Sequence, residues 1–379
     1  MVIWPIHLIL YHNYTTPRVT INRLLGCAHP TLAFVLKTFF KKETMKKSSL
    51  SNSVGSTSAQ ISATGVLVIP DGTKTIKQFE YRGNESIKTV EIPNSVTKIS
   101  RGAFENCSRL SCIKGGDGLK EISIRAFKGT ALKEIVLPKS LLRLREHAFE
   151  DCDYLESVDF DNDDTIVETG CFKFCSALNT ILLPMNMDEI PDELFWACYK
   201  LENVALSPNL RTIGNCSFVW CRKLEQFGYY SFAKYQGAVI PNTVTKVGDG
   251  AFWGCMGITN ITIPNSITEI GNDSFTYCSC LTKVDIPDSV TCIGDRAFMH
   301  CKEMSSAHIG KAVKSIGMKA FANNEMLTEV TFTSAVITSI YADAFDDCNN
   351  LKFINVPACA IGAYKRLLPK HLHNMLVGF

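Results

Sequence analysis

The sequence has little net charge and no long uninterrupted hydrophobic segment. Its 379 residues include 39 Lys and Arg against 37 Asp and Glu, a formal net charge of +2. This near neutrality argues against a nucleic-acid binder, because such proteins need basic residues in excess to neutralise phosphates. Residues 24–40 are largely apolar, but His29, Pro30 and Lys37 interrupt them. A membrane-spanning helix needs ~20 consecutive apolar residues, so the sequence shows no clear membrane span.

Signatures of catalysis and of cofactor binding are missing as well. The sequence contains no P-loop, no Gly-x-Gly-x-x-Gly motif and no nucleophile elbow, and paired carboxylates occur only in turn segments. His371 and His373 lie close together, but two imidazoles alone do not make a metal site. We therefore predict a protein that is not an enzyme and that uses no cofactor and no metal.

Repetition is what the sequence has in abundance. Residues 258–280 and 281–303 align without a gap as two units, ITNITIPNSITEIGNDSFTYCSC and LTKVDIPDSVTCIGDRAFMHCKE. Starting residues at the same spacing are Leu132, Leu155, Leu178, Leu201, Leu224 and, after one interruption, Ile258, Leu281, Met304 and Leu327. A fixed period in the twenties is typical of a solenoid, in which each unit forms one coil that packs on its neighbours.

The positions within one unit predict its local structure. The fourth and sixth residues are apolar, as in Val284 and Ile286, so they share one face of a strand, while the third and fifth face the other way. Pro287 then ends the strand, because proline cannot donate a ladder hydrogen bond. A turn at Asp288-Ser289 and a second, shorter β-branched run follow.

Each unit closes with a small residue, a phenylalanine, two variable residues and, in most units, a cysteine. We expect this segment to form one tight helical turn, with its phenylalanines stacked as an internal spine. These phenylalanines are Phe104, Phe127, Phe149, Phe172, Phe195, Phe218, Phe252, Phe275, Phe298, Phe321 and Phe345, and Tyr81 occupies the same position in a weak first unit.

Nine of the 16 cysteines occupy the last position of the closing turn. They are Cys107, Cys152, Cys175, Cys198, Cys221, Cys255, Cys278, Cys301 and Cys348. Stacked in register, such thiols point the same way at the strand spacing, which is longer than the ~3.8 Å between Cβ atoms that a disulfide prefers. A linear stack does not converge on a zinc ion either. We expect buried structural thiols that donate weakly to backbone carbonyls.

The pattern L-x-x-[IV]-x-I-P-[ND]-[ST]-V-T-x-I-G-x-x-A-F-x-x-C resembles the BspA-like (Treponema pallidum type) class of leucine-rich repeats. The resemblance covers about residues 64–370 and includes a terminal unit that leads from Pro357 into a capping helix near Tyr364. It implies an α/β repeat fold: a right-handed solenoid of about twelve 23-residue coils with a parallel sheet on the concave face and short strands and helical turns elsewhere. It also implies binding, often adhesion at a cell surface, without catalysis.

The charge distribution separates a leader from the repeats. Residues 1–63 contain seven Lys or Arg residues and one Glu, a net charge of +6, which leaves the remainder mildly acidic. We expect residues 1–63 to be a poorly ordered basic leader, and residues 64–379 to form the solenoid with a cap from about residue 358. The first ten residues make a poor signal peptide, which favours a cytoplasmic protein, whereas the resemblance favours a secreted or surface location.

Two segments depart from the repeat, and each has two interpretations. The acidic turn at Asp159, Asp161, Asp163 and Asp164 is either a solvated turn or a source of oxygen ligands for calcium. Eleven extra residues around 225–235 read EQFGYYSFAKY. They form either a loop that presents aromatic side chains to a partner or a loop that folds back and buries them.

We therefore predict a non-enzymatic scaffold that binds a protein or peptide partner and no nucleic acid. The alternative is a cell-surface adhesin or structural surface protein. The candidate partner-binding residues are Glu91, Glu134, Asp159, Asn203, Asn260, Thr262, Asp285 and Glu329 on the concave face, and Phe227, Tyr229, Tyr230 and Phe232 in the insertion.

Overall fold

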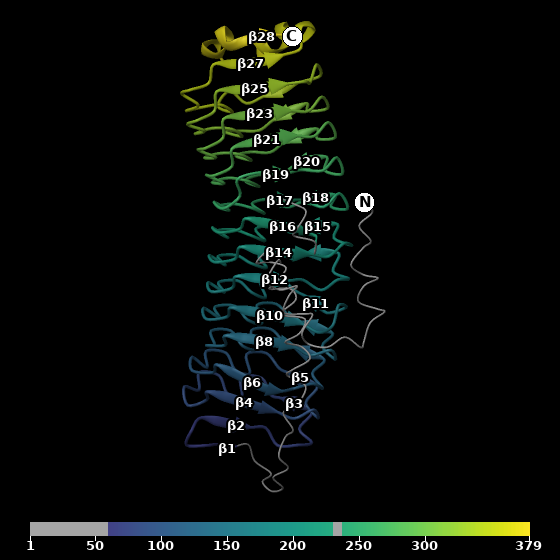
Figure 1. The fold of residues 1–379 in the computed structure, drawn as a ribbon, viewed down its shortest axis with the longest axis vertical. Helices are drawn as coiled ribbons and strands as arrows, with labels where there is room; N and C mark the ends of the chain where they lie inside the picture. Colours follow the sequence, from purple (N-terminus) through teal and green to yellow (C-terminus); the bar gives the residue numbers. More distant parts are fainter. Residues whose placement is uncertain (1–59, 230–236) are drawn as a thin grey trace, which may run out of the picture. The chain divides into compact units, whose positions relative to one another are not determined.

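A computed structural model describes residues 60–229 and 237–379 of the chain. These residues form a parallel β-solenoid of about 13 coils, close to the number expected, and the coils stack one on another in Figure 1. Most of the predicted leader, residues 1–59, lies outside the described residues.

One side of the solenoid is built from the first strand of each coil, which is the longer one in most coils; these are here called the main strands. They are β2 (Val66–Val68), β4 (Thr89–Ile92), β6 (Cys112–Gly115), β8 (Glu134–Leu137), β10 (Ser157–Phe160), β12 (Thr180–Leu182), β14 (Asn203–Leu206), β16 (Gln226–Tyr229), β17 (Ala238–Val239), β19 (Ile261–Thr262), β21 (Lys283–Ile286), β23 (Ser306–Ile309), β25 (Glu329–Phe332) and β27 (Phe353–Val356). They pair in parallel as three successive sheets, which break between β6 and β8 and between β19 and β21.

The second β-branched run of each coil forms a strand of two residues on another side, as the sequence predicts. These minor strands are β3 (Thr75–Ile76), β5 (Lys98–Ile99), β7 (Glu121–Ile122), β9 (Arg143–Leu144), β11 (Ile166–Val167), β13 (Glu189–Ile190), β15 (Thr212–Ile213), β18 (Lys246–Val247), β20 (Glu269–Ile270), β22 (Cys292–Ile293), β24 (Ser315–Ile316) and β26 (Ser339–Ile340). They also pair in parallel, with breaks between β11 and β13 and between β18 and β20.

The register of the strands follows the repeat. Lys283 of β21 lies opposite Ser306 of β23, which lies opposite Glu329 of β25. Equivalent positions therefore stack above one another along the solenoid. The fourth and sixth positions face inward, and Val284 and Ile286 are buried. The outward positions form two rows on the surface.

The predicted aromatic spine is confirmed. Phe275 stacks between Phe252 and Phe298, with ring centroids 5.4 and 5.2 Å apart and interplanar angles of 3° and 6°. Tyr81 begins the stack 5.3 Å from Phe104, and Phe345 ends it. Each interior ring touches its neighbours in both adjacent coils, so the spine runs along the whole core.

The closing turns differ in detail from a helical turn. Thr276 and Cys278 donate backbone hydrogen bonds within the turn, to Asp273 and Phe275. Phe275 donates instead to the next coil, from its backbone nitrogen to the carbonyl of Ala297 (2.8 Å). Asp273 and Tyr277 have positive φ angles of 55° and 60°, which interrupt a helix. The turns thus form a third hydrogen-bonded side of the solenoid.

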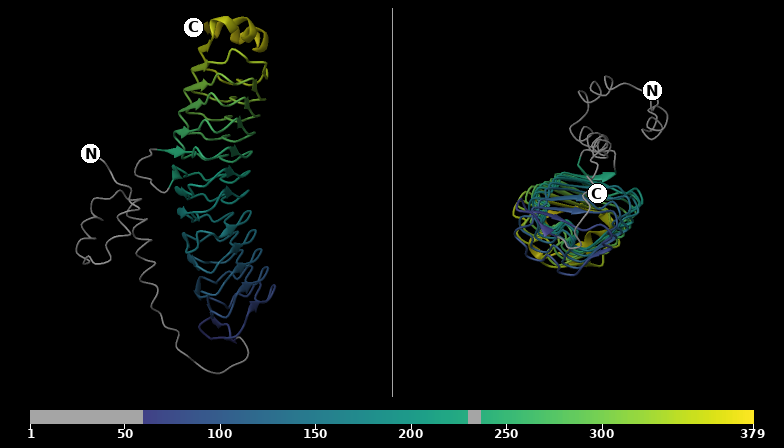
Figure 2. Two further views of the ribbon diagram at one scale, coloured as in Figure 1. Left: turned by 90° about the vertical axis from the view of Figure 1, so that its right-hand side faces the viewer. Right: turned by 90° about the horizontal axis from the view of Figure 1, so that it is seen from below.

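Special elements close the two ends. At the beginning, β1 (Gln60–Ile61) pairs antiparallel with β2. At the other end follow η3 (Ala358–Ala360), α4 (Ile361–Leu367), η4 (Lys370–Met375) and β28 (Leu376–Gly378). Tyr364 of α4 is buried and donates a hydrogen bond to the Ser334 carbonyl (2.8 Å), so α4 covers the end of the core. Figure 2 shows this helical cap across the last coil.

Candidate partner-binding face

The outward side of the main strands, here called the main face, carries the predicted binding residues. Of the eight, Glu134, Asn260, Thr262, Asp285 and Glu329 are exposed, and Glu91, Asp159 and Asn203 are half-buried. Their strands belong to different sheets: β4 to the first, β8 to β19 to the second, and β21 and β25 to the third. The candidates therefore follow the length of the solenoid rather than forming one compact cluster.

The main face is less acidic than its carboxylates alone suggest. Lys114 Nζ lies 3.1 Å from Glu91 Oε1 on the neighbouring strand. Lys283 Nζ lies 3.9 Å from Asp285 Oδ2 on the same strand. The third coil departs from the repeat pattern around Gly115 and Gly116, and Lys114 was therefore not among the residues predicted to lie on this face.

The centre of the main face is small and neutral. Thr180 and Ala205 stand at outward positions of β12 and β14, yet both are buried. Asn203 approaches Thr180, with 3.4 Å between its Nδ2 and Thr180 Oγ1. Exposed charged groups at outward positions are found on both sides of this zone, at Glu134 and at Asp285. Along the main face, the outward positions therefore carry charge, then a stretch of neutral residues, then charge again.

The insertion is partly a strand, which corrects one expectation. Residues 226–229 form β16, paired in register with β14, and the chain returns as β17 beside it. Phe227 is 1% exposed, and its ring meets Phe218 and Phe252 edge-on at 5.2 and 5.3 Å. The prediction that Phe227 contacts a partner is wrong, because its position in β16 points inward.

The other insertion candidates remain predictions. Tyr229 lies opposite Leu206 in the backbone pairing of β16 with β14. Tyr230 and Phe232 lie outside the described residues. The minor strands pass directly from β15 to β18, and Phe218 stacks on Phe252 at 5.4 Å. The insertion therefore adds a main strand without adding a minor strand or a spine ring.

The thiols of the closing turns are structural groups, as predicted. Cys278 Sγ donates to the Phe252 carbonyl (3.3 Å), and Cys301 Sγ donates to the Phe275 carbonyl (3.2 Å). Where one coil lacks cysteine, Asn324 Nδ2 makes the equivalent bond to the Phe298 carbonyl (3.1 Å). Burial raises the pKa of the Cys152 thiol to about 11. This thiol stays protonated near neutral pH, and only the thiolate is a good nucleophile.

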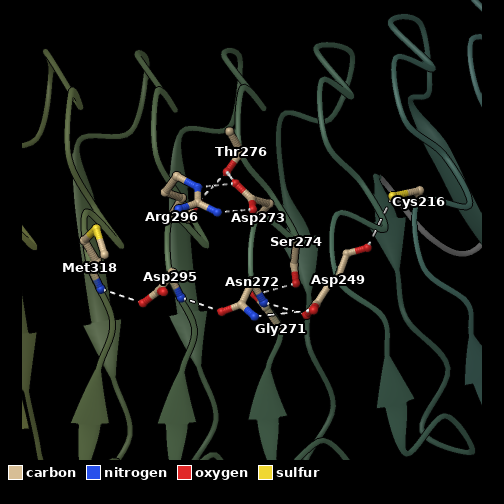
Figure 3. Close-up of polar contacts among 10 residues, drawn as sticks. All are labelled: Cys216, Asp249, Gly271, Asn272, Asp273, Ser274, Thr276, Asp295, Arg296 and Met318. Atoms are coloured by element: carbon tan, nitrogen blue, oxygen red, sulfur yellow. Dashed lines mark hydrogen bonds and ion pairs between the residues drawn. The ribbon is translucent and has the colours of Figure 1, made fainter.

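A polar ladder along the turns was not predicted. Asn272 N donates to Asp249 Oδ1 (2.8 Å), Asp295 N donates to Asn272 Oδ1 (2.9 Å), and Met318 N donates to Asp295 Oδ1 (2.8 Å) (Figure 3). The ladder extends back through Asn215 to Asp192. Asp and Asn alternate, so no two carboxylates occupy adjacent rungs. An Asp or Asn directly after the second strand and its glycine was the signal in the sequence.

An aromatic cluster lies beside the closing turns and was also missed. The Trp220 ring centroid is 6.5 Å from that of Trp253 and 6.1 Å from that of Tyr277. The guanidinium of Arg222 lies over the rings of Trp220 and Tyr199, at 5.2 and 5.0 Å. Trp, Tyr and Arg are the residues enriched at binding hot spots. The signal in the sequence was aromatic residues next to the turn cysteines: Trp220 and Tyr277 directly before one, and Trp253 two residues before one.

The acidic turn links one coil to the next. Asp163 Oδ1 accepts a hydrogen bond from the Met185 backbone (3.2 Å), and Asp164 Oδ1 accepts one from Asn186 Nδ2 (2.6 Å). These bonds occupy oxygens that calcium would need. Within the described residues no group of three or more His, Cys, Asp or Glu side chains is arranged to hold a metal ion. The same part of the chain has no helix with the length and hydropathy to cross a membrane.

Comparisons with solved structures agree with this architecture. A leucine-rich repeat protein from Bacteroides ovatus is 26% identical, with a TM-score of 0.58 over 83% of this chain and 92% of that one. The pneumococcal vaccine antigen PcpA is 18% identical, with a TM-score of 0.54 over 81% and 84%. A leucine-rich repeat protein from Eubacterium ventriosum is also 18% identical, with a TM-score of 0.52 over 75% and 82%.

Sequence comparison identifies the repeats themselves. No curated protein matches the chain. The family model of the BspA type leucine rich repeat region matches residues 60–128, 120–237 and 222–352 in six copies. These matches cover most of the chain and coincide with the coils described above. This protein therefore belongs to the BspA type leucine-rich repeat family.

Proposed function

We propose that this chain is a protein-binding scaffold that performs no catalysis and that meets a protein or peptide partner with its main face. The proposal rests on how the residues at equivalent positions vary from coil to coil. The inward positions repeat the same residue types in every coil, whereas the outward positions change from coil to coil. The row that contains Lys283 continues with Ser306 and then Glu329. Variation at fixed spacing gives an extended surface that one partner can recognise along its length.

The dimensions of the main face suit a macromolecular partner. Neighbouring main strands are ~4.8 Å apart, so the outward rows of a dozen coils extend on the order of 60 Å. A small ligand would cover only a short part of this length, whereas a protein interface can extend over much of it. Its mixture of Glu, Asp, Lys, Asn and Thr side chains offers hydrogen bonds and charge pairs to a polar protein surface.

Charge reversal on the main face tests the proposal. The partner is first recovered from the source cell with the full chain as bait and is then purified. Asp285→Lys and Glu134→Lys change exposed main-face residues, and Glu269→Lys changes an exposed residue of the minor strand β20. We expect the two main-face variants to weaken binding about tenfold or more and the control to bind within about twofold. Equal affinities for all three variants would overturn the proposal.

A role at the cell surface is the second candidate. The observation that favours it is the presence of six Asn-x-Ser/Thr sequons, which suit glycosylation in a secreted protein. Asn272 bonds within the polar ladder, whereas Asn106 and Asn260 are exposed. Labelling of intact source cells with a membrane-impermeant reagent, followed by glycopeptide mass spectrometry, tests this role. External labelling with a glycan on Asn106 or Asn260 supports it, and a protein protected from the reagent contradicts it.

A further inference from the structure

The last strand of the main sheets has an open edge. Within the described residues β28 has one strand neighbour, β27, which it joins in parallel. Phe379 N donates to the Val356 carbonyl (3.1 Å), and Ala358 N donates to the Phe379 carbonyl (2.9 Å). Backbone groups alternate in direction along a strand, so those of Val377 also face β27. The N–H and C=O of Gly378 therefore point away from the sheet.

Nothing in β28 blocks the addition of another strand. Proteins usually protect such edges with charged residues, proline or a bulge, or by keeping the edge strand very short. β28 is short, but its residues Leu376, Val377 and Gly378 include no charge and no proline. α4 covers the inward side of β28. Its residue Ile361 packs so closely on Gly378 that a Cβ atom added to Gly378 would lie 2.5 Å from Ile361 Cδ1. The outer edge and the outward side of β28 stay accessible.

Apolar side chains border this edge on the main face. Val377 lies opposite Asn355, so it shares the outward side with Phe353, two residues before Asn355 on β27. Phe379 follows Val377 at the same alternation. Phe353, Val377 and Phe379 are 51%, 43% and 64% exposed. Strand addition uses two components, contacts for side chains and a ladder for the main chain. The three exposed apolar groups offer the first, and the free backbone groups of Gly378 offer the second.

The charge of this end indicates the chemistry of its partner. Residues 348–379 contain four Lys or Arg residues and no Asp or Glu. Lys365 and Arg366 of α4 are exposed, as is Lys370 of η4. A basic end favours an acidic ligand. The leader of this chain is itself basic, and a second copy that pairs through the same edge would bring two basic ends together.

We propose that an extended segment of a partner protein, with alternating acidic and apolar residues, adds to β28 as the next strand. Its backbone pairs with the open edge at Gly378. Its apolar side chains contact Phe353, Val377 and Phe379, and its carboxylates meet the basic residues of the cap. This inference goes beyond the proposed function, because it concerns the end of the solenoid and does not depend on binding along the main face.

Three synthetic peptides of about seven residues test the proposal on the full chain. One alternates Glu and Val, the second is the same peptide with an N-methyl group on every residue, and the third alternates Lys and Val. Fluorescence anisotropy measures their binding. We expect the Glu-Val peptide to bind saturably below about 1 mM and to weaken as salt rises. We expect the other two to bind at least about tenfold more weakly, because one lacks backbone donors and the other has the wrong charge.

Matched variants place the binding on the cap. Phe353→Ser removes an apolar contact, and Tyr154→Ser removes an exposed aromatic ring, 61% exposed, from a distant coil. Lys370→Glu reverses an exposed charge at the cap, and Lys139→Glu reverses one elsewhere. We expect each cap variant to weaken binding of the Glu-Val peptide about fivefold or more, and each control to leave it within about twofold.

Several outcomes would overturn the proposal. Absence of saturable binding by the Glu-Val peptide would remove its basis, and equal binding of the N-methylated peptide would exclude strand pairing. Binding to vesicles of phosphatidylserine and phosphatidylcholine, without peptide binding, would assign the cap to an anionic lipid surface. Dimerisation in sedimentation experiments that Phe353→Ser abolishes, without peptide binding, would assign the edge to a second copy of this chain.

Discussion

The interior and the main face of this solenoid follow opposite rules. In the interior every coil contributes nearly the same groups: a phenylalanine that stacks on its neighbours and, in most coils, a thiol that donates to a carbonyl. On the main face, equivalent outward positions hold Lys283, Ser306 and Glu329 in successive coils. The interior is constrained because each coil must fit both adjacent coils. The outward positions of the main face have no such constraint, so their residues can differ from coil to coil.

Because the interior repeats and the main face varies, we expect substitutions in the interior to change stability and substitutions on the main face to change binding. A change in the interior affects packing with two neighbouring coils, so its effect on the free energy of unfolding is large. A change on the main face affects exposed side chains, whose contributions to stability are small. We therefore expect large losses in the free energy of unfolding at the repeated interior positions and small losses at the variable outward positions.

Alkaline pH tests the interior most strongly, because many thiols act together. Burial raises the pKa values of Cys152 and Cys348 to about 11, from an ordinary value near 9. The folded state then holds protons that the unfolded state releases. Stability is fully present below pH about 9 and is lost as pH rises towards 11, by at most about 1.4 kcal/mol per pH unit for each thiol. Urea unfolding under reducing conditions between pH 8 and 10.5 measures this slope.

A single thiol variant sharpens the alkaline prediction. We expect Cys152→Ala to lower the free energy of unfolding at pH 8. We also expect it to make the loss of stability per pH unit above pH 9 smaller by the contribution of one thiol. Cys280→Ala, which changes an exposed cysteine, is the control and should leave the slope unchanged. A slope that is the same in the chain and in Cys152→Ala would contradict the burial of this thiol as its cause.

The polar ladder should have an intermediate effect. Asn272→Ala removes the acceptor for the Asp295 backbone N–H, and we expect it to destabilise the fold by about 1 kcal/mol. Asn272→Asp keeps an acceptor but places a carboxylate between Asp249 and Asp295. We therefore expect its destabilisation at low salt to be relieved at high salt. Thermal unfolding at the two salt concentrations measures both, and a salt-independent loss would contradict the role of alternating charge.

Charged pairs on the main face should have the smallest effect on stability. Lys114→Ala removes the exposed pair with Glu91, whose atoms are 3.1 Å apart. Exposed ion pairs contribute about 0–1 kcal/mol, so we expect the unfolding midpoint in urea to change little. The same variant makes the first sheet of the main face more acidic, which alters binding if a partner contacts it. A loss of stability above about 2 kcal/mol would show that this pair belongs with the interior groups.

Most of the fold could be predicted from the sequence because its order is local and periodic. The 23-residue period alone assigns the main strand, the minor strand, the spine residue and the thiol of each coil. The bond from Cys278 to the Phe252 carbonyl follows from the same register. The alternation of side chains along a strand predicted which positions face outward. Seven of the eight residues predicted to bind a partner on the concave face lie on main strands.

The unpredicted features depend on relations between coils that the period does not contain. Phe227 is an exception among these features: it lies 23 residues after Val204, its partner in the pairing of β16 with β14, so the period itself places it inward. The sheets also break between particular strands, as between β19 and β21, at positions that the repeat pattern does not mark. The open edge of β28 arises where the repeat ends and α4 covers the core.

The most direct test of the division between interior and main face compares two variants of the same coil. Phe275 is buried between two stacked rings, and Thr262 is exposed on β19. Urea unfolding of Phe275→Ala and Thr262→Ala measures the free energy of unfolding of each. We expect a loss of about 3–5 kcal/mol for Phe275→Ala and of less than about 0.5 kcal/mol for Thr262→Ala. Equal losses would contradict this expectation.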